Sequence, residues 1–334
     1  MFVNNSSEFF LSAEQNETCL LPTDFKGMEI THASIYCVLL IASIIGNSLL
    51  IFASLKSKLT INLLIANIAA SDFLFSIVLY PREIVAQIKG STAFLVHGWI
   101  GLFLCKICAF VADVTIAVST LSLILVAADR LAAVVFSRKY RRITIKKRRL
   151  LILSTWILAM AIHSPYFYTF RLGEFNGETF CITNWEPAFN HETTHTRYYT
   201  AVLITVLIVP LITVCLLHTI ALVKLRDDKM RSFRSSTASQ RRKNMNKALL
   251  KMSIVIVFAF TLCWLPFLAL QFIFLFLSSL IPHCSLGFTI FTQFAILISL
   301  FHSIVNPCIC FTFMRRLRVV LKSRRLMKQS ATVL

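Results

Sequence analysis

The stretch that decides the fold runs from Met252 to Met314 and reads MSIVIVFAFTLCWLPFLALQFIFLFLSSLIPHCSLGFTIFTQFAILISLFHSIVNPCICFTFM. It contains no Asp, Glu, Lys or Arg. A helix that spans a membrane needs about 20 mainly apolar residues, so this stretch is too long for one crossing. The segment Ser278–His283 interrupts it with serines and a proline, which mark a turn. We therefore expect two membrane-spanning helices here.

Five further stretches are long and apolar enough to span a membrane, and only two of them contain a charged residue, Asp72 or Asp113. They are Ile30–Leu55, Leu59–Pro81, Ile107–Ala128, Leu150–Phe170 and Tyr198–Val223. Only 15% of all residues are charged, whereas a soluble domain usually has about 25%. The sequence thus predicts an all-α membrane protein built as a seven-transmembrane helix bundle.

The orientation of the bundle follows from the basic residues. Most of the 34 Lys and Arg residues fall in segments that alternate with the spans, all on one side. These segments are 56–58, 138–149, 224–251 and 315–328. The positive-inside rule makes that side cytoplasmic, and its charge favours anionic lipid and an acidic partner surface over nucleic acid. Glycosylation acceptors at Asn4, Asn5 and Asn16 place the N-terminus outside. We expect a multi-pass protein of the plasma membrane with a cytoplasmic C-terminus.

Several polar residues lie at membrane depth, where an unsatisfied polar group costs several kcal/mol. Asp72 lies near the middle of its span, and Asn47, Ser119, Ser303 and Asn306 lie at comparable depths. A carboxylate with several hydroxyl and amide oxygens can hold a small hydrated cation such as Na⁺. A plain interhelical hydrogen-bond network fits the same residues equally well.

A second constellation closes the third span. Asp129 and Arg130 stand at its cytoplasmic end, and Arg130 is about three helical turns from Ser119, so both side chains face the bundle interior. An Arg that reaches the membrane surface beside a neutralising Asp is the alternative interpretation. Four external cysteines, Cys19, Cys105, Cys181 and Cys284, allow three pairings, and their spacing does not choose among them.

Together these residues resemble the rhodopsin-like (class A) family of G-protein-coupled receptors, and neuropeptide receptors in particular. The resemblance covers residues 30–325 and depends on one signature per helix in the right order. The signatures are Gly46-Asn47, Asp72, Trp99, Cys105, Asp129-Arg130, Trp156, Cys181, Pro210, Phe260, Cys263-Trp264-Leu265-Pro266 and Asn306-Pro307. It implies an extracellular segment over 1–29, a receptor domain over 30–312, and a membrane-surface helix with a short tail over 313–334.

The resemblance assigns roles to individual residues. It implies a Cys105–Cys181 disulfide and suggests a second, Cys19–Cys284 bridge. It implies an allosteric sodium site at Asp72, Asn47, Ser119 and Ser303, with no cofactor required and no enzymatic activity. It implies that Trp264 senses the ligand and that Arg130 meets a heterotrimeric G protein. The coupling set it implies is Asp129, Arg130, Phe260, Trp264, Pro266, Asn306 and Pro307.

The chain departs from the family pattern on the cytoplasmic side. Leu131 follows Asp129-Arg130 in place of the usual Tyr, and the tyrosines expected in the fifth and seventh helices are His218 and Cys310. The base of the sixth helix has Asn246 and Lys247 where an acidic partner for Arg130 is common. We expect measurable signalling without agonist.

Two classes of ligand can be excluded from the sequence, monoamines and retinal. The position at which aminergic receptors carry an Asp is Ala112, and no Lys between Lys251 and Lys322 could hold retinal. Acidic residues in the external loop 171–197 and the N-terminal segment favour a basic neuropeptide. The expected ligand-binding residues are Glu83, Ala112, Asp113, Ile116, Trp264, Phe267 and Gln271. The polar residues in this list, Glu83, Asp113 and Gln271, fit a second interpretation equally well. They would then be solvated at the lipid interface or form hydrogen bonds between helices.

Two other functions stay open at this point. A receptor for a lipid or another small molecule is the alternative within the family, and a seven-helix transporter is the alternative outside it. A transporter would show repeated halves around a midplane site, and the sequence has no such repeat. The final residues, Thr332–Leu334, fit a ligand of PDZ proteins, although three residues also match by chance.

Overall fold

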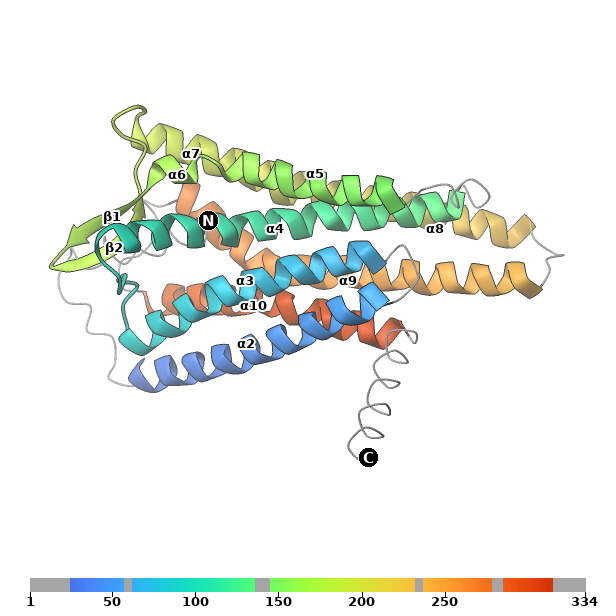
Figure 1. Ribbon diagram of the computed structural model, residues 1–334, viewed down its shortest axis with the longest axis horizontal. Coiled ribbons are helices and arrows are strands. Elements are labelled where there is room, and N and C mark those ends of the chain that lie inside the picture. Colours follow the sequence, from blue (N-terminus) through green and yellow to red (C-terminus); the bar gives the residue numbers. More distant parts are fainter. Residues whose placement is uncertain (1–24, 57–61, 136–144, 232–236, 278–284, 315–334) are drawn as a thin grey trace.

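The computed structural model describes residues 25–56, 62–135, 145–231, 237–277 and 285–314 (Figure 1). These residues form long helices and one two-stranded sheet. In chain order the elements are α2 (Phe25–Lys56), α3 (Asn62–Lys89), α4 (Gly98–Val135), α5 (Ile145–His163), α6 (Tyr166–Thr169), β1 (Phe170–Phe175), β2 (Glu178–Thr183), α7 (His191–Val202), the π-helical turn η2 (Leu203–Ile208), α8 (Val209–Arg231), α9 (Thr237–Phe276) and α10 (Leu286–Phe313).

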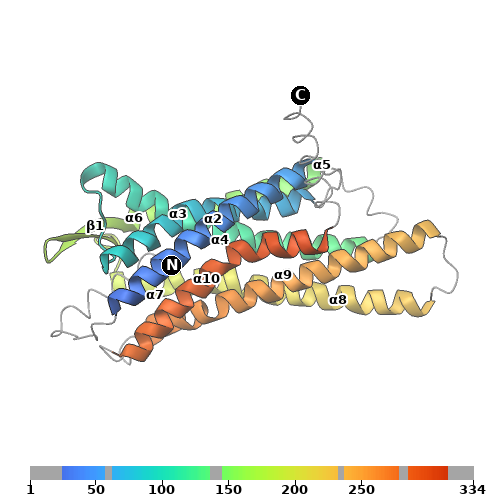
Figure 2. The ribbon, with the colours of Figure 1, turned by 90° about the horizontal axis from the view of Figure 1, so that it is seen from below.

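Seven helical segments in the described residues are long and apolar enough to cross a membrane, which confirms the predicted bundle. They run side by side in two perpendicular views, with α7, η2 and α8 forming one continuous segment (Figures 1 and 2). The helices are longer than their uncharged cores: α2 begins at Phe25 rather than Ile30, and α4 extends over Gly98–Val135. Polar residues at helix ends continue the helix into the interface, so charge-free stretches underestimate its length.

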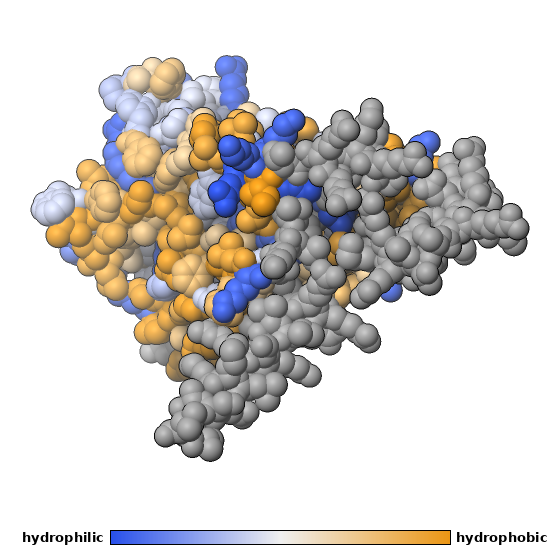
Figure 3. Space-filling model, turned by 45° about the vertical axis from the view of Figure 1, so that its right-hand side comes forward, coloured by the Kyte–Doolittle hydropathy of each residue, from blue (hydrophilic) through white to orange (hydrophobic). Residues whose placement is uncertain are grey.

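The surface and the interior have reversed polarity compared with a soluble protein. Large apolar side chains such as Ile41, Ile45 and Leu216 lie exposed on the outer faces of the helices, and apolar residues cover much of the described surface in Figure 3. Buried in the interior are the polar residues Asn47 and Asp72. Lipid is as apolar as these outer side chains, so burying them inside the protein gains little, and polar groups go where they find partners.

The π-helical turn η2 interrupts the α7–α8 segment immediately before Pro210. Proline lacks an N–H and clashes with the carbonyl four residues earlier in a regular helix. That carbonyl belongs to Val206, within η2, where the wider turn relieves the clash. The fifth span therefore tolerates Pro210 without breaking.

A β-hairpin that the sequence analysis did not predict lies at one end of the bundle (Figure 1). Strands β1 and β2 pair antiparallel, with Leu172 opposite Cys181. They are joined by Asn176 and Gly177, which both have positive φ. Asn-Gly is a strong two-residue hairpin signal because Asn and Gly tolerate this backbone conformation. We refer to this as the hairpin end of the bundle.

A disulfide between Cys105 and Cys181 ties β2 to α4, as the family resemblance implied. The Cα atoms of the two cysteines are 5.6 Å apart. The other predicted bridge, Cys19–Cys284, lies outside the described residues. So do the glycosylation acceptors Asn4, Asn5 and Asn16, the membrane-surface helix after Met314, and Thr332–Leu334.

Candidate functional site

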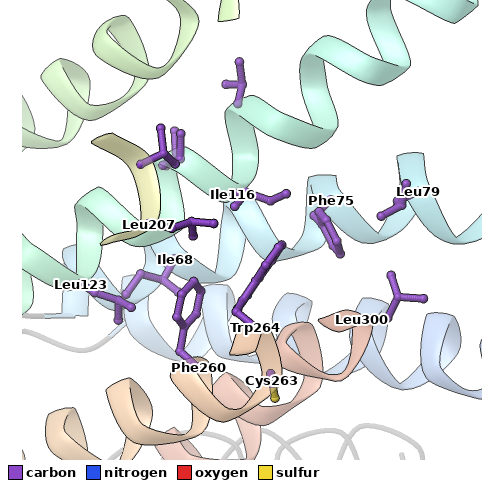
Figure 4. Close-up of a cluster of buried hydrophobic side chains, with 14 of the residues drawn as sticks. Ile68, Phe75, Leu79, Ile116, Leu123, Leu207, Phe260, Cys263, Trp264 and Leu300 are labelled. Atoms are coloured by element: carbon purple, nitrogen blue, oxygen red, sulfur yellow. The ribbon is translucent and has the colours of Figure 1, made fainter. Parts of the chain in front are cut away.

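An aromatic cluster fills the middle of the bundle around Trp264 of α9, which is almost fully buried (Figure 4). Phe260 stacks on Trp264 with ring centroids 5.8 Å apart, and Phe267 meets it edge-on at 5.7 Å. The ring of His302, on α10, lies 5.2 Å from Trp264. The three aromatic residues of α9 lie along one face of that helix, around Pro266. A change in the bend of α9 at Pro266 would therefore move their rings relative to His302.

His302 connects this cluster to the polar centre of the bundle. Its Nδ1 donates to the carbonyl of Ser299 at 2.6 Å, and its Nε2 lies 3.8 Å from Oδ1 of Asp72. Its ring also packs edge-on against Phe75 at 4.8 Å. The sequence analysis did not single out His302 as a site residue. Its position next to Ser303, on the face of α10 that meets Asp72, was the available signal.

Asp72 accepts hydrogen bonds from two of the residues predicted to surround it. Ser119 Oγ donates to Oδ1 at 2.9 Å, and Asn306 Nδ2 donates to Oδ2 at 2.7 Å. Asn47 and Ser303 pair with each other instead, because Asn47 Nδ2 donates to the carbonyl of Ser303 at 2.8 Å. The structure thus gathers the predicted residues into one network, but only Ser119 and Asn306 bond to the carboxylate in the described part of the chain.

At the opposite end from the hairpin, Asp129 holds two guanidinium groups. Arg130 donates to Oδ2, and Arg148 of α5 donates to Oδ1 at 2.8 Å. Arg130 and Arg148 are both almost fully buried. Arg130 therefore faces the interior and does not extend to the membrane surface. Arg148 was missed by the sequence analysis because it stands in a run of basic residues whose other members are exposed.

The predicted ligand-binding residues divide into two groups. Ala112, Ile116, Phe267 and Gln271 are buried in the bundle, as is Trp264. Asp113 points to the other side of α4, because its carboxylate accepts from the hydroxyl of Tyr166 in α6 at 2.5 Å. Glu83 is buried on α3, one turn from Gln87, whose amide donates to Gln293 of α10 at 3.1 Å.

Comparison with known proteins decides the family. Residues 46–310 match the family described as "7 transmembrane receptor (rhodopsin family)". The chain belongs to this family. The match includes five membrane helices in full, parts of the first and the last, and both cysteines of the disulfide, and it agrees with the expectation that the chain is not an enzyme.

Curated relatives of the receptor are named for peptides. The chain is 26% identical over 240 residues to the "QRFP-like peptide receptor" of Branchiostoma floridae, which covers 70% of the chain and 61% of that relative. It is 28% identical over 276 residues to "Somatostatin receptor type 4" of Rattus norvegicus, covering 79% and 67%. "Neuropeptide receptor 22" of Caenorhabditis elegans is 27% identical over 321 residues, covering 91% and 71%. The chain spans about three fifths of the length of the first of these.

Between the Asp72 network and Arg130 the receptor has a small cavity. His218 of α8 and Cys310 of α10, which replace two tyrosines of the family pattern, both line it, together with Asn306. Both ring nitrogens of His218 are buried without a hydrogen-bond partner among the described residues. Apolar side chains form most of the remaining wall. The two departures from the family pattern therefore line the same cavity.

Proposed function

We propose that this receptor binds a basic extracellular peptide and activates a heterotrimeric G protein through the cytoplasmic ends of α4, α8 and α9. The chain belongs to the rhodopsin family, but it spans only part of the length of its relatives. The ligand class and the coupling to a G protein are therefore part of the proposal. Three relatives are named as peptide receptors, which supports a peptide as the class of ligand. The receptor would lie in the plasma membrane with the hairpin end outside.

The observation that carries the proposal is the acidic character of the hairpin end. The acidic residues of segment 171–197, which includes the hairpin and the start of α7, are all exposed. They are Glu174, Glu178, Glu186 and Glu192. Carboxylates at the entrance of a bundle steer a cationic ligand and raise its association rate, an effect that salt screens. A lipid or an anionic small molecule would gain from the opposite sign.

The test is a panel of amidated basic neuropeptides applied to cells that express the receptor, with calcium and cAMP as readouts. We expect at least one peptide to signal, and an analogue with each Arg replaced by citrulline to lose potency. A parallel panel of lipid ligands serves as the comparison. Silence across the peptide panel at confirmed surface expression, or a response to lipids alone, would overturn the peptide assignment.

We also propose that Na⁺ binds at the Asp72 network as an allosteric ion. The carboxylate of Asp72 and the hydroxyl of Ser119, 2.9 Å apart, are the kind of oxygen ligands that a small hard cation prefers. The buried Oδ1 of Asn47 has no hydrogen-bond partner among the described residues, so one oxygen is available. Asp72 and Ser119 would hold the ion, with Asn47 and Ser303 completing the site. The ion would stabilise the packed arrangement around Asp72.

Two further contacts are proposed for the basic side of the receptor. Anionic membrane lipid would meet the Lys and Arg residues at the cytoplasmic ends of the helices, for example Lys56, Lys146 and Arg149, which are exposed. A PDZ protein could bind Thr332–Leu334 by strand addition. Mutating Leu334 to Lys and measuring pull-down by PDZ domains tests the second contact.

A further inference from the structure

The first turn of α7 carries a pattern that the receptor function does not explain. It reads His191-Glu192-Thr193-Thr194-His195 and lies at the hairpin end. Asn190 caps this helix, since its side chain accepts from the backbone N–H of Thr193 at 3.1 Å. Residues four apart on a helix lie on the same face. The cap therefore fixes a helical turn that presents His191 and His195 side by side.

The two imidazoles have the separation that a shared metal ion requires. Their ring centroids are 5.3 Å apart. With a Zn–N bond of about 2.0–2.1 Å and tetrahedral geometry, the centroids of two imidazoles on one zinc ion lie roughly 5 Å apart. The two rings are thus already at the spacing that one shared ion requires.

Each ring is also oriented through one nitrogen. Nδ1 of His195 lies 3.4 Å from the hydroxyl of Thr183 in β2. Nδ1 of His191 accepts from the backbone N–H of Trp185 at 3.4 Å. Metal-ligating histidines commonly donate through the nitrogen that does not bind the ion, and Nδ1–H of His195 can donate to Thr183 in this way. Because Nδ1 of His191 accepts from Trp185, the proton of its neutral ring is on Nε2. An ion on Nε2 of His191 requires this proton to move to Nδ1, which gives up the Trp185 contact.

We propose that His191 and His195 form an extracellular binding site for Zn²⁺ or a similar transition-metal ion. Imidazole is a preferred ligand of these ions. No third His, Cys, Asp or Glu joins the pair among the residues that the structure describes. The remaining positions are therefore filled by water or by a donor group of an extracellular ligand.

Metalloproteases have two zinc-binding histidines at the same spacing, with a catalytic Glu between them. The site in this receptor would bind a metal ion without hydrolysing a peptide bond. Glu192 is exposed and points about 100° around the helix from His191. A hydrolytic zinc site uses three protein ligands and a water, and the described residues supply two. The ion has a structural consequence instead.

That consequence follows from what the pair touches. His195 packs on Tyr199 with centroids 4.6 Å apart, and Tyr199 lies 6.4 Å from Tyr166, the residue that donates to Asp113. On the other side, Thr183 belongs to the strand that the disulfide ties to α4. An ion on the pair would thus hold the His195 ring in place between Thr183 of β2 and Tyr199 of α7.

The test uses purified full-length receptor freed of metal with a chelator and titrated with ZnCl₂ alone. We expect one bound ion per receptor by equilibrium dialysis and a rise in the thermal midpoint. His195→Gln should weaken binding by at least about tenfold and abolish the rise, because one of two ligands is lost. His195→Cys should keep zinc binding and favour Cd²⁺, since a thiolate is a softer ligand.

Two controls separate the pair from other external groups. His97 also has its Nδ1 beside a threonine hydroxyl, that of Thr179 at 2.8 Å, but it has no histidine partner in the described residues. His97→Gln and Glu192→Gln should both keep the zinc response. Equal zinc binding by His195→Gln and the unmodified receptor, or no stabilisation of the unmodified receptor, would refute the site, whatever the identity of the agonist.

Discussion

Single side chains link the aromatic cluster around Trp264 to the polar centre of the receptor around Asp72. Trp264 meets His302, and His302 lies next to Asp72, which in turn accepts from Asn306. These four residues come from three helices, α3, α9 and α10. A shift of Trp264 on α9 would therefore change the surroundings of the Asp72 carboxylate, and an ion at Asp72 would in turn favour one position of Trp264.

The first prediction concerns Asp72 itself. In the purified receptor, NaCl should raise the thermal midpoint above that in N-methyl-glucamine chloride of equal ionic strength, because the ion binds the folded state. Asp72→Asn should remove this difference, since the amide does not neutralise the ion. Asp113→Asn is the matched control, because Asp113 is also a buried carboxylate, on α4, and accepts from Tyr166. This variant should keep the difference in thermal midpoint between the two salts. A sodium effect that survives in Asp72→Asn would exclude the site.

The sequence could predict part of this residue-level network and not the rest. Asp72, Ser119 and Asn306 were placed together because they share one depth in the membrane and match family signatures. His302 and Arg148 were not found, since depth and composition do not tell which member of a polar run faces inward. Among the basic residues Lys146–Arg149, only Arg148 is buried, and its tertiary partner Asp129 decides that.

At the level of elements, Arg148 joins the start of α5 to the end of α4. Breaking a buried ion pair by removing one partner costs about 3–5 kcal/mol, because a buried charge loses its compensation. Arg148→Ala should therefore lower the thermal midpoint strongly. Arg149→Ala removes the same charge from an exposed position on the same helix and should change stability little. Equal midpoints for the two variants would show that the pair contributes nothing to holding α5 against α4.

The seven spans could be predicted from apolar stretches that contain at most one charged residue, whereas the element that covers one end of the bundle could not. Strands β1 and β2 have six residues each, and their Asn176-Gly177 turn is a hairpin signal that hydropathy does not register. The disulfide partner of Cys105 likewise came from the family resemblance, because four external cysteines allow three pairings. Long-range pairing in loops depends on the folded arrangement of the helices around it.

Over the whole molecule, the two ends of the bundle are built differently. The hairpin end is tied together by the disulfide and by a contact between Thr183 of β2 and His195 of α7. At the opposite end, α8 and α9 extend past the other helices (Figures 1 and 2). The Asp129–Arg130 pair lies within α4, so it does not connect α4 to α9, and positions 246 and 247 of α9 carry Asn and Lys rather than an acid.

This asymmetry predicts signalling without agonist, given G-protein coupling. Membranes that contain the receptor should show basal nucleotide exchange above that of mock-transfected membranes, because no acid at the base of α9 restrains Arg130 in the inactive arrangement. Asn246→Glu should lower basal exchange by supplying that acid. Lys224→Glu adds a negative charge on α8 at the same membrane face, from an exposed position, and should leave basal exchange unchanged. Basal exchange equal to that of mock membranes, at confirmed expression, would mean that the Asp129 pair with Arg130 and Arg148 is enough to hold the receptor inactive.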